Sequence, residues 1–171
     1  MESDALRAQP VAQACSQPLP ILVNRLLADL PSYANRVAQR DRSEASPLRS
    51  YLLLAGRPIF EPLPLNQQQL QPQGPDTTQQ VFFTTLERQY NNRQINTQQN
   101  FYWAFFVPTQ QGWQLALLYA QLAARPPQNR PLPPQSAENS AVGRAIQLWL
   151  RDCQAGVLKE SIDQGIDKAQ Q

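Results

Sequence analysis

The feature that most constrains the fold is the stretch NFYWAFFVPTQQGWQLALLYAQLA at residues 100–123, where two apolar runs flank the polar turn PTQQG. This pattern predicts a β-hairpin, and Gly112 suits its turn because glycine readily adopts a positive φ angle. Since alternate residues of a strand point to opposite faces, the two runs are expected to present one shared row of large side chains. That row comprises Phe101, Trp103, Phe105, Trp113, Leu115, Leu117 and Tyr119.

The other face of this hairpin is also apolar, with Tyr102, Phe106, Leu118 and Leu122 on it. Strands that are apolar on both faces are typical of a sheet covered on both sides. They are equally typical of a sheet covered on one side that offers a contact surface on the other. The sequence leaves these two arrangements open.

The N-terminal third is predicted to be helical, because its apolar residues recur at helical spacing. Pro31 cannot continue a helix without losing a hydrogen bond but suits a helix start, so we expect two short helices, 20–29 and 31–41. Several arginines gather here, Arg36 and Arg40 among them. They indicate either a patch for an acidic partner or a solvated helix face, and we favour the solvated face.

Two further segments, 48–60 and 79–90, are rich in strand-forming residues. They predict two more strands, the first ending near Gly56 and Pro58, with a polar turn region over 91–99. Local hairpins favour an antiparallel meander. The predicted fold class is therefore α+β: a four-stranded antiparallel meander sheet with N- and C-terminal helices packed on one face.

The best amphipathic stripe of the chain lies in residues 136–156, which predict a helix capped by Ser136 or Ser140 and ended by Gly156. Cys153 lies on this stripe and is expected to face the core. The other cysteine is Cys15, at the opposite end of the predicted domain.

A disulfide between Cys15 and Cys153 would close almost the whole fold into one loop. Two reduced thiols in the cytosol, or a lipid on Cys15, are the alternatives. No CxxC or metal-ligand spacing is present. The stretch PVAQA before Cys15 has the small-x-small pattern of a signal-peptidase site, without the apolar core of an export signal.

Three parts of the chain are predicted: a disordered segment 1–14, a single α+β domain 15–156 and a tail 157–171. Within the domain, residues 61–80 form a loop rich in proline and glutamine. No apolar run is long enough to span a bilayer, so we expect no transmembrane segment.

Composition excludes several kinds of chemistry. The chain contains no histidine, which removes Ser-His-Asp and Cys-His catalysis and histidine-ligated zinc. The net charge of +2 is too small to steer the chain to nucleic acid. Charged residues make up only 16% of the chain, whereas 26 residues are glutamine and 16 are proline. Polar but uncharged side chains of this kind suit an interface that avoids the desolvation of charges.

Five segments together resemble a group of small, uncharacterised exported proteins of cyanobacteria. They are LLADLPSYANRVAQR, YLLLAGRPIFEPLPL, QQVFFTTLERQY, GWQLALLYAQLA and AIQLWLRDCQAG. The resemblance covers residues 15–156. It implies a periplasmic or thylakoid-lumenal location, with cysteines that match Cys15 and Cys153, and it is consistent with a disulfide. It implies no activity.

We therefore expect a non-catalytic extracytoplasmic accessory protein that docks on a larger assembly, with a photosynthetic membrane complex suggested by resemblance alone. No catalytic residue, cofactor or metal site is predicted. The candidate contact surface comprises Trp103, Phe105, Trp113, Tyr119, Arg36 and Arg40. One alternative is a small-ligand binder that uses the aromatic sheet face. The other is a carboxylate-based enzyme, in which Glu87, buried in an apolar strand, would supply acid–base chemistry. We favour instead a structural Glu87 that lies at a strand edge beside Arg88 or another arginine.

Overall fold

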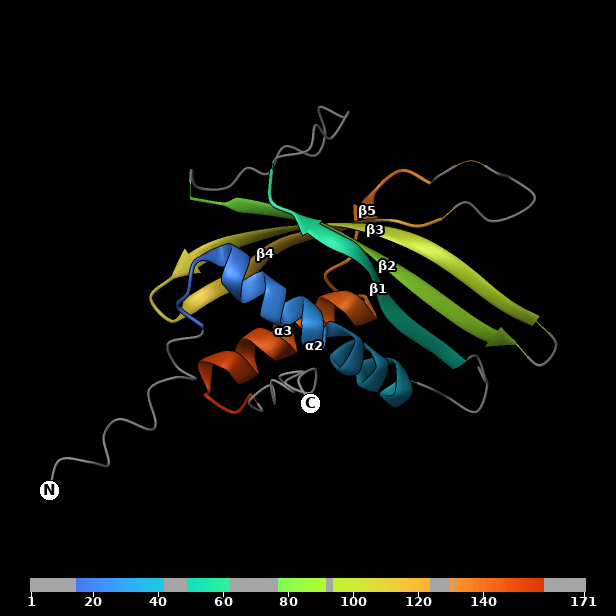
Figure 1. Ribbon diagram of the computed structural model, residues 1–171, viewed down its shortest axis with the longest axis horizontal. Helices are drawn as coiled ribbons and strands as arrows, with labels where there is room; N and C mark the ends of the chain where they lie inside the picture. Colours follow the sequence, from blue (N-terminus) through green and yellow to red (C-terminus); the bar gives the residue numbers. More distant parts are fainter. Residues whose placement is uncertain are drawn as a thin grey trace, which may run out of the picture.

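An antiparallel sheet with two helices against one of its faces makes up the described part of the protein (Figure 1). The computed structural model describes residues 15–41, 49–61, 77–91, 94–123, 130 and 132–158. The strands lie side by side in chain order, β1-β2-β3-β4-β5. The elements are α2 (Leu19–Arg40), β1 (Arg49–Ile59), β2 (Gln79–Asn91), β3 (Gln94–Thr109), β4 (Gly112–Gln121), β5 (Gln135–Ser136) and α3 (Ala141–Gln154).

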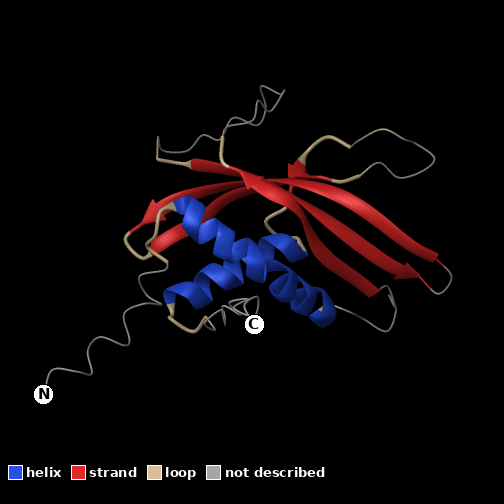
Figure 2. Ribbon diagram, in the orientation of Figure 1, coloured by secondary structure: helices blue, strands red, loops and turns tan. Residues whose placement is uncertain are grey.

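The predicted fold class is confirmed at the level of an α+β meander with helices on one face, which Figure 2 shows clearly. The predicted number of strands is wrong by one. The fifth strand is only two residues long and pairs Ser136 with Tyr119 on β4, which is too short to leave a pattern in the sequence. The segment 1–14, most of the loop 61–80 and most of the tail 157–171 lie outside the described residues.

The prediction of two N-terminal helices is wrong, because α2 runs without a break from Leu19 to Arg40 with Pro31 inside it. Proline at this place removes one hydrogen bond to the preceding turn. The helix nevertheless continues, since a buried stripe on both sides of Pro31 packs against the sheet and α3. That stripe comprises Leu19, Leu22, Val23, Leu26, Leu27, Leu30, Ala34 and Val37.

The C-terminal helix is confirmed, and Ser140 is its N-cap. The Ser140 hydroxyl accepts a hydrogen bond from the backbone N–H of Gly143 at 3.1 Å. Gly143 itself lies so close to the preceding turn that an added Cβ would stand 2.4 Å from the carbonyl oxygens of Ala137 and Glu138. Glycine at this position lets the helix start directly against the strand connection. Gly156 follows the helix with a φ of 72°.

The predicted disulfide is present between Cys15 and Cys153, whose Cα atoms are 5.8 Å apart. Cys153 is completely buried on the inner stripe of α3, and Cys15 is 4% exposed. The bond joins the segment before α2 to the last turn of α3. It therefore fastens both helices at the same end of the domain, although the two cysteines are 138 residues apart in the sequence.

The first predicted strand is confirmed, since β1 ends at Ile59, directly after Pro58. A bulge at Gly56, with φ of 77°, lets its pairing with β2 resume. The prediction of a polar turn over 91–99 is wrong for most of that region, because Asn91 is the last residue of β2 and residues 94–99 are the first part of β3, which pairs with β2 from Gln94 onward. Cross-strand pairing here overrides the weak strand propensity of asparagine and glutamine.

The central hairpin is confirmed, and Gly112 has the positive φ angle expected, 116°. Its strands do not share one continuous row of side chains, however. The register shifts so that Phe105 pairs with Leu117 and Phe106 pairs with Leu115, which leaves Ala116 in a bulge. Because of this bulge, the residues of β4 before Ala116 point to the opposite side of the sheet from the one that simple alternation predicts. Trp113 and Leu115 consequently pack on the helix side of the sheet with the main core.

Candidate functional site

The face of the sheet turned away from the helices, which we call the open face, carries a row of aromatic side chains from three neighbouring strands. The pairing register of β2, β3 and β4 places these side chains together on the side away from the helices. The residues that alternate with them along the strands form the core between the sheet and the helices. The open-face aromatics are Phe82, Phe101, Trp103, Phe105 and Tyr119.

These aromatic rings contact one another across the strands. The ring of Phe82 lies 5.3 Å from that of Trp103 and 6.1 Å from that of Phe101. Phe105 and Tyr119 meet edge to face, with their centroids 6.1 Å apart. Separations in this range are favourable for aromatic pairs. The rings therefore form two contacting groups on this face, Phe82 with Phe101 and Trp103, and Phe105 with Tyr119.

Among the described residues of the open face, two side-chain nitrogen donors are buried without an acceptor. They are the indole N–H of Trp103 and the side-chain amide of Gln80. The residues lie on adjacent strands, since Gln80 pairs with Phe105 and Phe82 pairs with Trp103. A buried donor that lacks an acceptor costs about 1–3 kcal/mol. The open face therefore holds two buried N–H donors without acceptors beside its aromatic side chains.

The ends of the open face carry large apolar side chains that water reaches. Tyr51 is 48% exposed and Ile59 40%, and both project from β1 on this side. Tyr90 and Ile95 pair across β2 and β3 and are 39% and 67% exposed. Several exposed apolar side chains on one face of a sheet are typical of interaction sites.

The structure separates the six residues predicted as one contact surface. Trp103, Phe105 and Tyr119 lie together on the open face. Trp113 is on the opposite side, where its indole N–H donates to the backbone oxygen of Gln17 at 3.0 Å. The prediction that it shares the face of Tyr119 is wrong because of the bulge at Ala116.

The two arginines of that set belong to the other layer of the molecule. Arg36 and Arg40 are exposed on α2. The guanidinium of Arg36 lies 4.5 Å from the ring centre of Tyr33, and its Nε donates to the Ser32 oxygen. The helix layer separates these arginines from the aromatic residues, so the six residues form no single surface.

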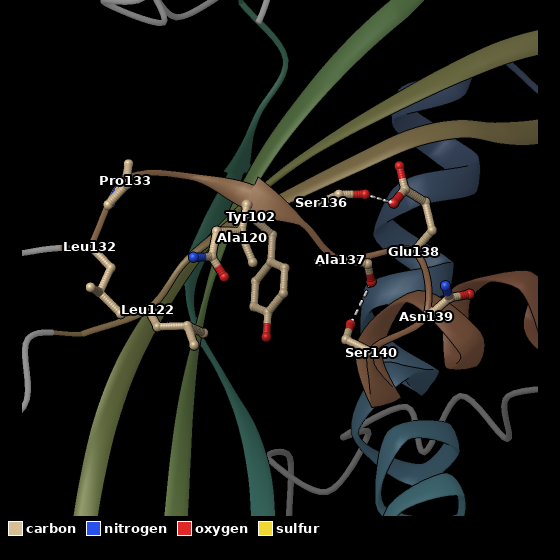
Figure 3. Close-up of a pocket in the computed structure, with 11 residues that line it drawn as sticks. Tyr102, Ala120, Leu122, Leu132, Pro133, Ser136, Ala137, Glu138, Asn139 and Ser140 are labelled. Atoms are coloured by element: carbon tan, nitrogen blue, oxygen red, sulfur yellow. Dashed lines mark hydrogen bonds between the residues drawn. The ribbon is translucent and has the colours of Figure 1, made fainter.

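A second candidate site is a groove between the helix side of the sheet and the start of α3, which we call the Tyr102 groove. It consists of two adjoining cavities of about 200 and 170 Å³ that share Tyr102, Leu122 and Ser140. Figure 3 shows the Tyr102 ring between Leu122 on one side and Ala137 and Ser140 on the other. Sequence alternation predicted Tyr102 only as an apolar residue of the second hairpin face, so it did not predict this groove.

The polar centre of the Tyr102 groove is a pair of side chains from adjacent strands. The Tyr102 hydroxyl donates to Oε1 of Glu87 at 3.0 Å. Burial raises the pKa of Tyr102 far above its usual value, and the adjacent Glu87 carboxylate raises it further. The prediction that Glu87 lies beside Arg88 or another arginine is not met within the described residues. Successive residues of β2 point to opposite faces, Arg88 is exposed on the other one, and no ion pair to Glu87 is formed in that part of the chain.

A different carboxylate at the groove, Glu138, holds the β4–β5–α3 corner together. It accepts hydrogen bonds from the Ser136 hydroxyl and from the backbone N–H of Leu118. Burial alone would raise the pKa of Glu138, but these hydrogen bonds outweigh burial and lower it. Both of its oxygens are engaged, so Glu138 has a structural role.

Within the described residues, no cluster of side chains has the composition of a metal site, and no helix is long and apolar enough to cross a membrane. Comparison with known proteins finds no matching family model, no matching curated protein and no matching solved structure. The resemblance to exported cyanobacterial proteins therefore stays a prediction.

Proposed function

We propose that this protein is a non-catalytic accessory protein that uses the open face of its sheet to dock on an apolar polypeptide surface of a larger assembly. The observation that carries this proposal is the set of large apolar side chains that water reaches on the open face, beside aromatic rings that contact one another. These exposed side chains are Tyr51, Ile59, Tyr90 and Ile95.

The character of the open face supports a protein partner of low charge. Its centre consists of aromatic and aliphatic side chains, and tryptophan and tyrosine are the residues enriched at the centres of interfaces. Thr84 and Leu86 continue the half-buried surface on β2, and the exposed Arg88 stands at its edge. This arrangement resembles a contact patch with an apolar centre and a polar rim.

An extracytoplasmic location is the second part of the proposal. The Cys15–Cys153 disulfide supports it, because disulfides persist in oxidising compartments and are rare in the cytosol. By resemblance alone, a photosynthetic membrane complex is the first assembly to test. The disulfide in cell-derived protein is checked by its mass without reductant, which should be two hydrogens below that of the reduced chain. Labelling of both thiols in freshly extracted protein would contradict this part.

A photo-crosslinking experiment in the native cell tests the docking face. A photoreactive amino acid replaces Thr84 on the open face in one variant and Arg36 on α2 in the matched control. We expect Thr84 to give a discrete heterologous adduct that Leu86→Arg abolishes, and Arg36 to give none. Crosslinking from Arg36 alone, a homodimer from Thr84, or an adduct that survives Leu86→Arg would each overturn the proposed docking mode.

A further inference from the structure

The cavity beside Glu87 places a carboxylate in an otherwise uncharged wall. This cavity, about 170 Å³ in volume, lies between α2, the start of α3 and the strands β1 to β3. Among the residues that line either cavity of the Tyr102 groove, none is lysine or arginine. Most of the wall beside Glu87 is apolar and comes from Ala34, Ala38, Leu52, Leu122, Ala141 and Val142.

Two other polar side chains of this wall, Asn35 and Ser140, are already hydrogen-bonded inside the protein. Asn35 uses its amide on the backbone of Leu52, where its Oδ1 accepts from N–H at 2.9 Å and its Nδ2 donates to the carbonyl oxygen. Ser140 donates to the Ala137 oxygen at 2.6 Å and accepts from Gly143 N–H. A ligand in this cavity therefore finds one principal unsatisfied group, the carboxylate of Glu87.

Glu87 is half-buried, and within the described residues its one hydrogen bond comes from the neutral hydroxyl of Tyr102. No ion pair to Glu87 is formed in that part of the chain. Taking a carboxylate out of water is unfavourable unless a cation or several donors replace the lost hydration. The site therefore has the charge and the free oxygen to receive a cationic group.

We propose that the Tyr102 groove binds an aliphatic primary ammonium group, which forms an ion pair with Glu87 and lays its carbon chain along the apolar wall. The Tyr102 hydroxyl oxygen is a second acceptor, because its proton is directed to Glu87. With a volume of about 170 Å³, the cavity has room for a short alkylammonium such as butylammonium.

The start of α3 also lines this cavity, and a helix N-terminus favours anions. Its partial charge is about half an elementary charge, and the first-turn N–H of Gly143 is already bonded to Ser140. The full negative charge of Glu87 is larger and faces the cavity directly. The balance therefore favours a cation, and an anion is retained as the opposite outcome of the test.

Titration of the full oxidised chain with n-butylammonium chloride, followed by amide chemical shifts, tests this site. We expect saturable chemical-shift changes at groove residues and binding of butylammonium at least tenfold tighter than that of 1-butanol. In Glu87→Gln, this preference for butylammonium over 1-butanol should be lost. Glutamine keeps an acceptor for Tyr102, so the fold is retained. Glu61→Gln, at an exposed carboxylate beyond β1, is the matched control and should leave the preference unchanged.

Two further arms sharpen the result. Ala38→Leu fills the cavity without changing its charge, and it should abolish butylammonium binding. Putrescine compared with Nα-acetyl-lysine methylamide distinguishes a free amine from a lysine side chain of a partner protein as the source of the ammonium group. Equal binding of 1-butanol, unchanged binding in Glu87→Gln, or tighter binding of acetate than of butylammonium would overturn the proposal. None of these outcomes involves the open face, so the docking proposal stands or fails separately.

Discussion

The two faces of the sheet are both aromatic, but they differ in how their polar atoms are satisfied. On the helix side, the indole N–H of Trp149 donates to Asp29 at 2.8 Å and that of Trp113 donates to the Gln17 oxygen. Tyr33 joins the two helices by donating to Asp152 at 2.8 Å. On the open face, the indole N–H of Trp103 is buried without an acceptor.

The contrast concerns the same type of side chain in two environments. Both Trp149 and Trp103 are largely removed from water, with exposed fractions of 1% and 9%. Within the described residues, the indole N–H of Trp149 has a hydrogen-bond acceptor and that of Trp103 has none. The indole donors of Trp113 and Trp149 are thus satisfied on the helix side, although the Thr85 hydroxyl there is buried without a partner in the described part of the chain. We assign docking to the open face because large apolar side chains are exposed on it, and structural support to the helix side because the main core lies there.

The largest expected effect concerns the bond that closes the helix side. Replacing both cysteines, Cys15→Ser with Cys153→Ser, should lower the free energy of unfolding by about 2–5 kcal/mol, since the disulfide restricts the unfolded chain across almost the whole domain. Urea unfolding of the oxidised chain, the reduced chain and the double variant measures this. Equal midpoints with and without reductant would show that the bond does not hold the helix layer.

A second prediction tests how tightly the start of α3 is packed. Gly143→Ala should destabilise the protein by about 2–4 kcal/mol, because the new Cβ would meet two backbone oxygens at 2.4 Å. Gly56→Ala is the control: nothing lies within 4 Å of its Cβ position, and only the positive φ angle opposes the substitution. Thermal unfolding compares them. A smaller loss for Gly143→Ala than for Gly56→Ala would contradict this view of the corner.

The third prediction compares the two faces directly. Trp149→Phe leaves Asp29 without its donor and should cost about 1.5–3 kcal/mol more than Trp103→Phe, which removes a donor that has no partner. Both substitutions delete the same atoms, so the loss of volume largely cancels. Denaturant unfolding of the two variants gives the difference. Equal destabilisation would mean that Trp103 is satisfied in solution, and the comparison of the faces would fail.

The smallest effect is a pH dependence. The pKa of Tyr102 is raised in the folded state, mainly by burial and then by Glu87, so the protonated hydroxyl is retained there after the unfolded chain has ionised. Stability is therefore complete below pH 10 and should fall above it, by up to about 1.4 kcal/mol per pH unit. Tyr102→Phe should flatten this alkaline slope. An unchanged slope in the variant would show that Tyr102 is not the group responsible.

Local patterns in the sequence were sufficient where one element decides its own structure. The apolar stripe of residues 136–156 predicted α3, and the turn glycine Gly112 predicted the centre of the hairpin. Local signals failed where a longer-range contact outweighs them. Pro31 should have ended a helix, but the buried stripe on both sides of it is worth more than one lost hydrogen bond.

The candidate sites depended more strongly on tertiary structure. Simple alternation placed Trp113 with Tyr119, and the bulge at Ala116 separated them, although no glycine or proline marks that bulge. The groove escaped prediction for a related reason. Tyr102 and Glu87 are 15 residues apart and meet only because β2 and β3 pair in this register.

By itself, the sequence determined the hairpin, the C-terminal helix, the antiparallel meander and the two cysteines that could join its ends, because propensity and periodicity act over a few residues. Tertiary structure alone decided which face the helices cover, since both faces of the hairpin are apolar enough to form a core. It also decided which polar atoms find partners, because a hydrogen bond requires two groups to meet in space. The buried Trp103 N–H without an acceptor, and the Glu87 carboxylate that meets a neutral hydroxyl and no cation within the described residues, both result from the tertiary structure.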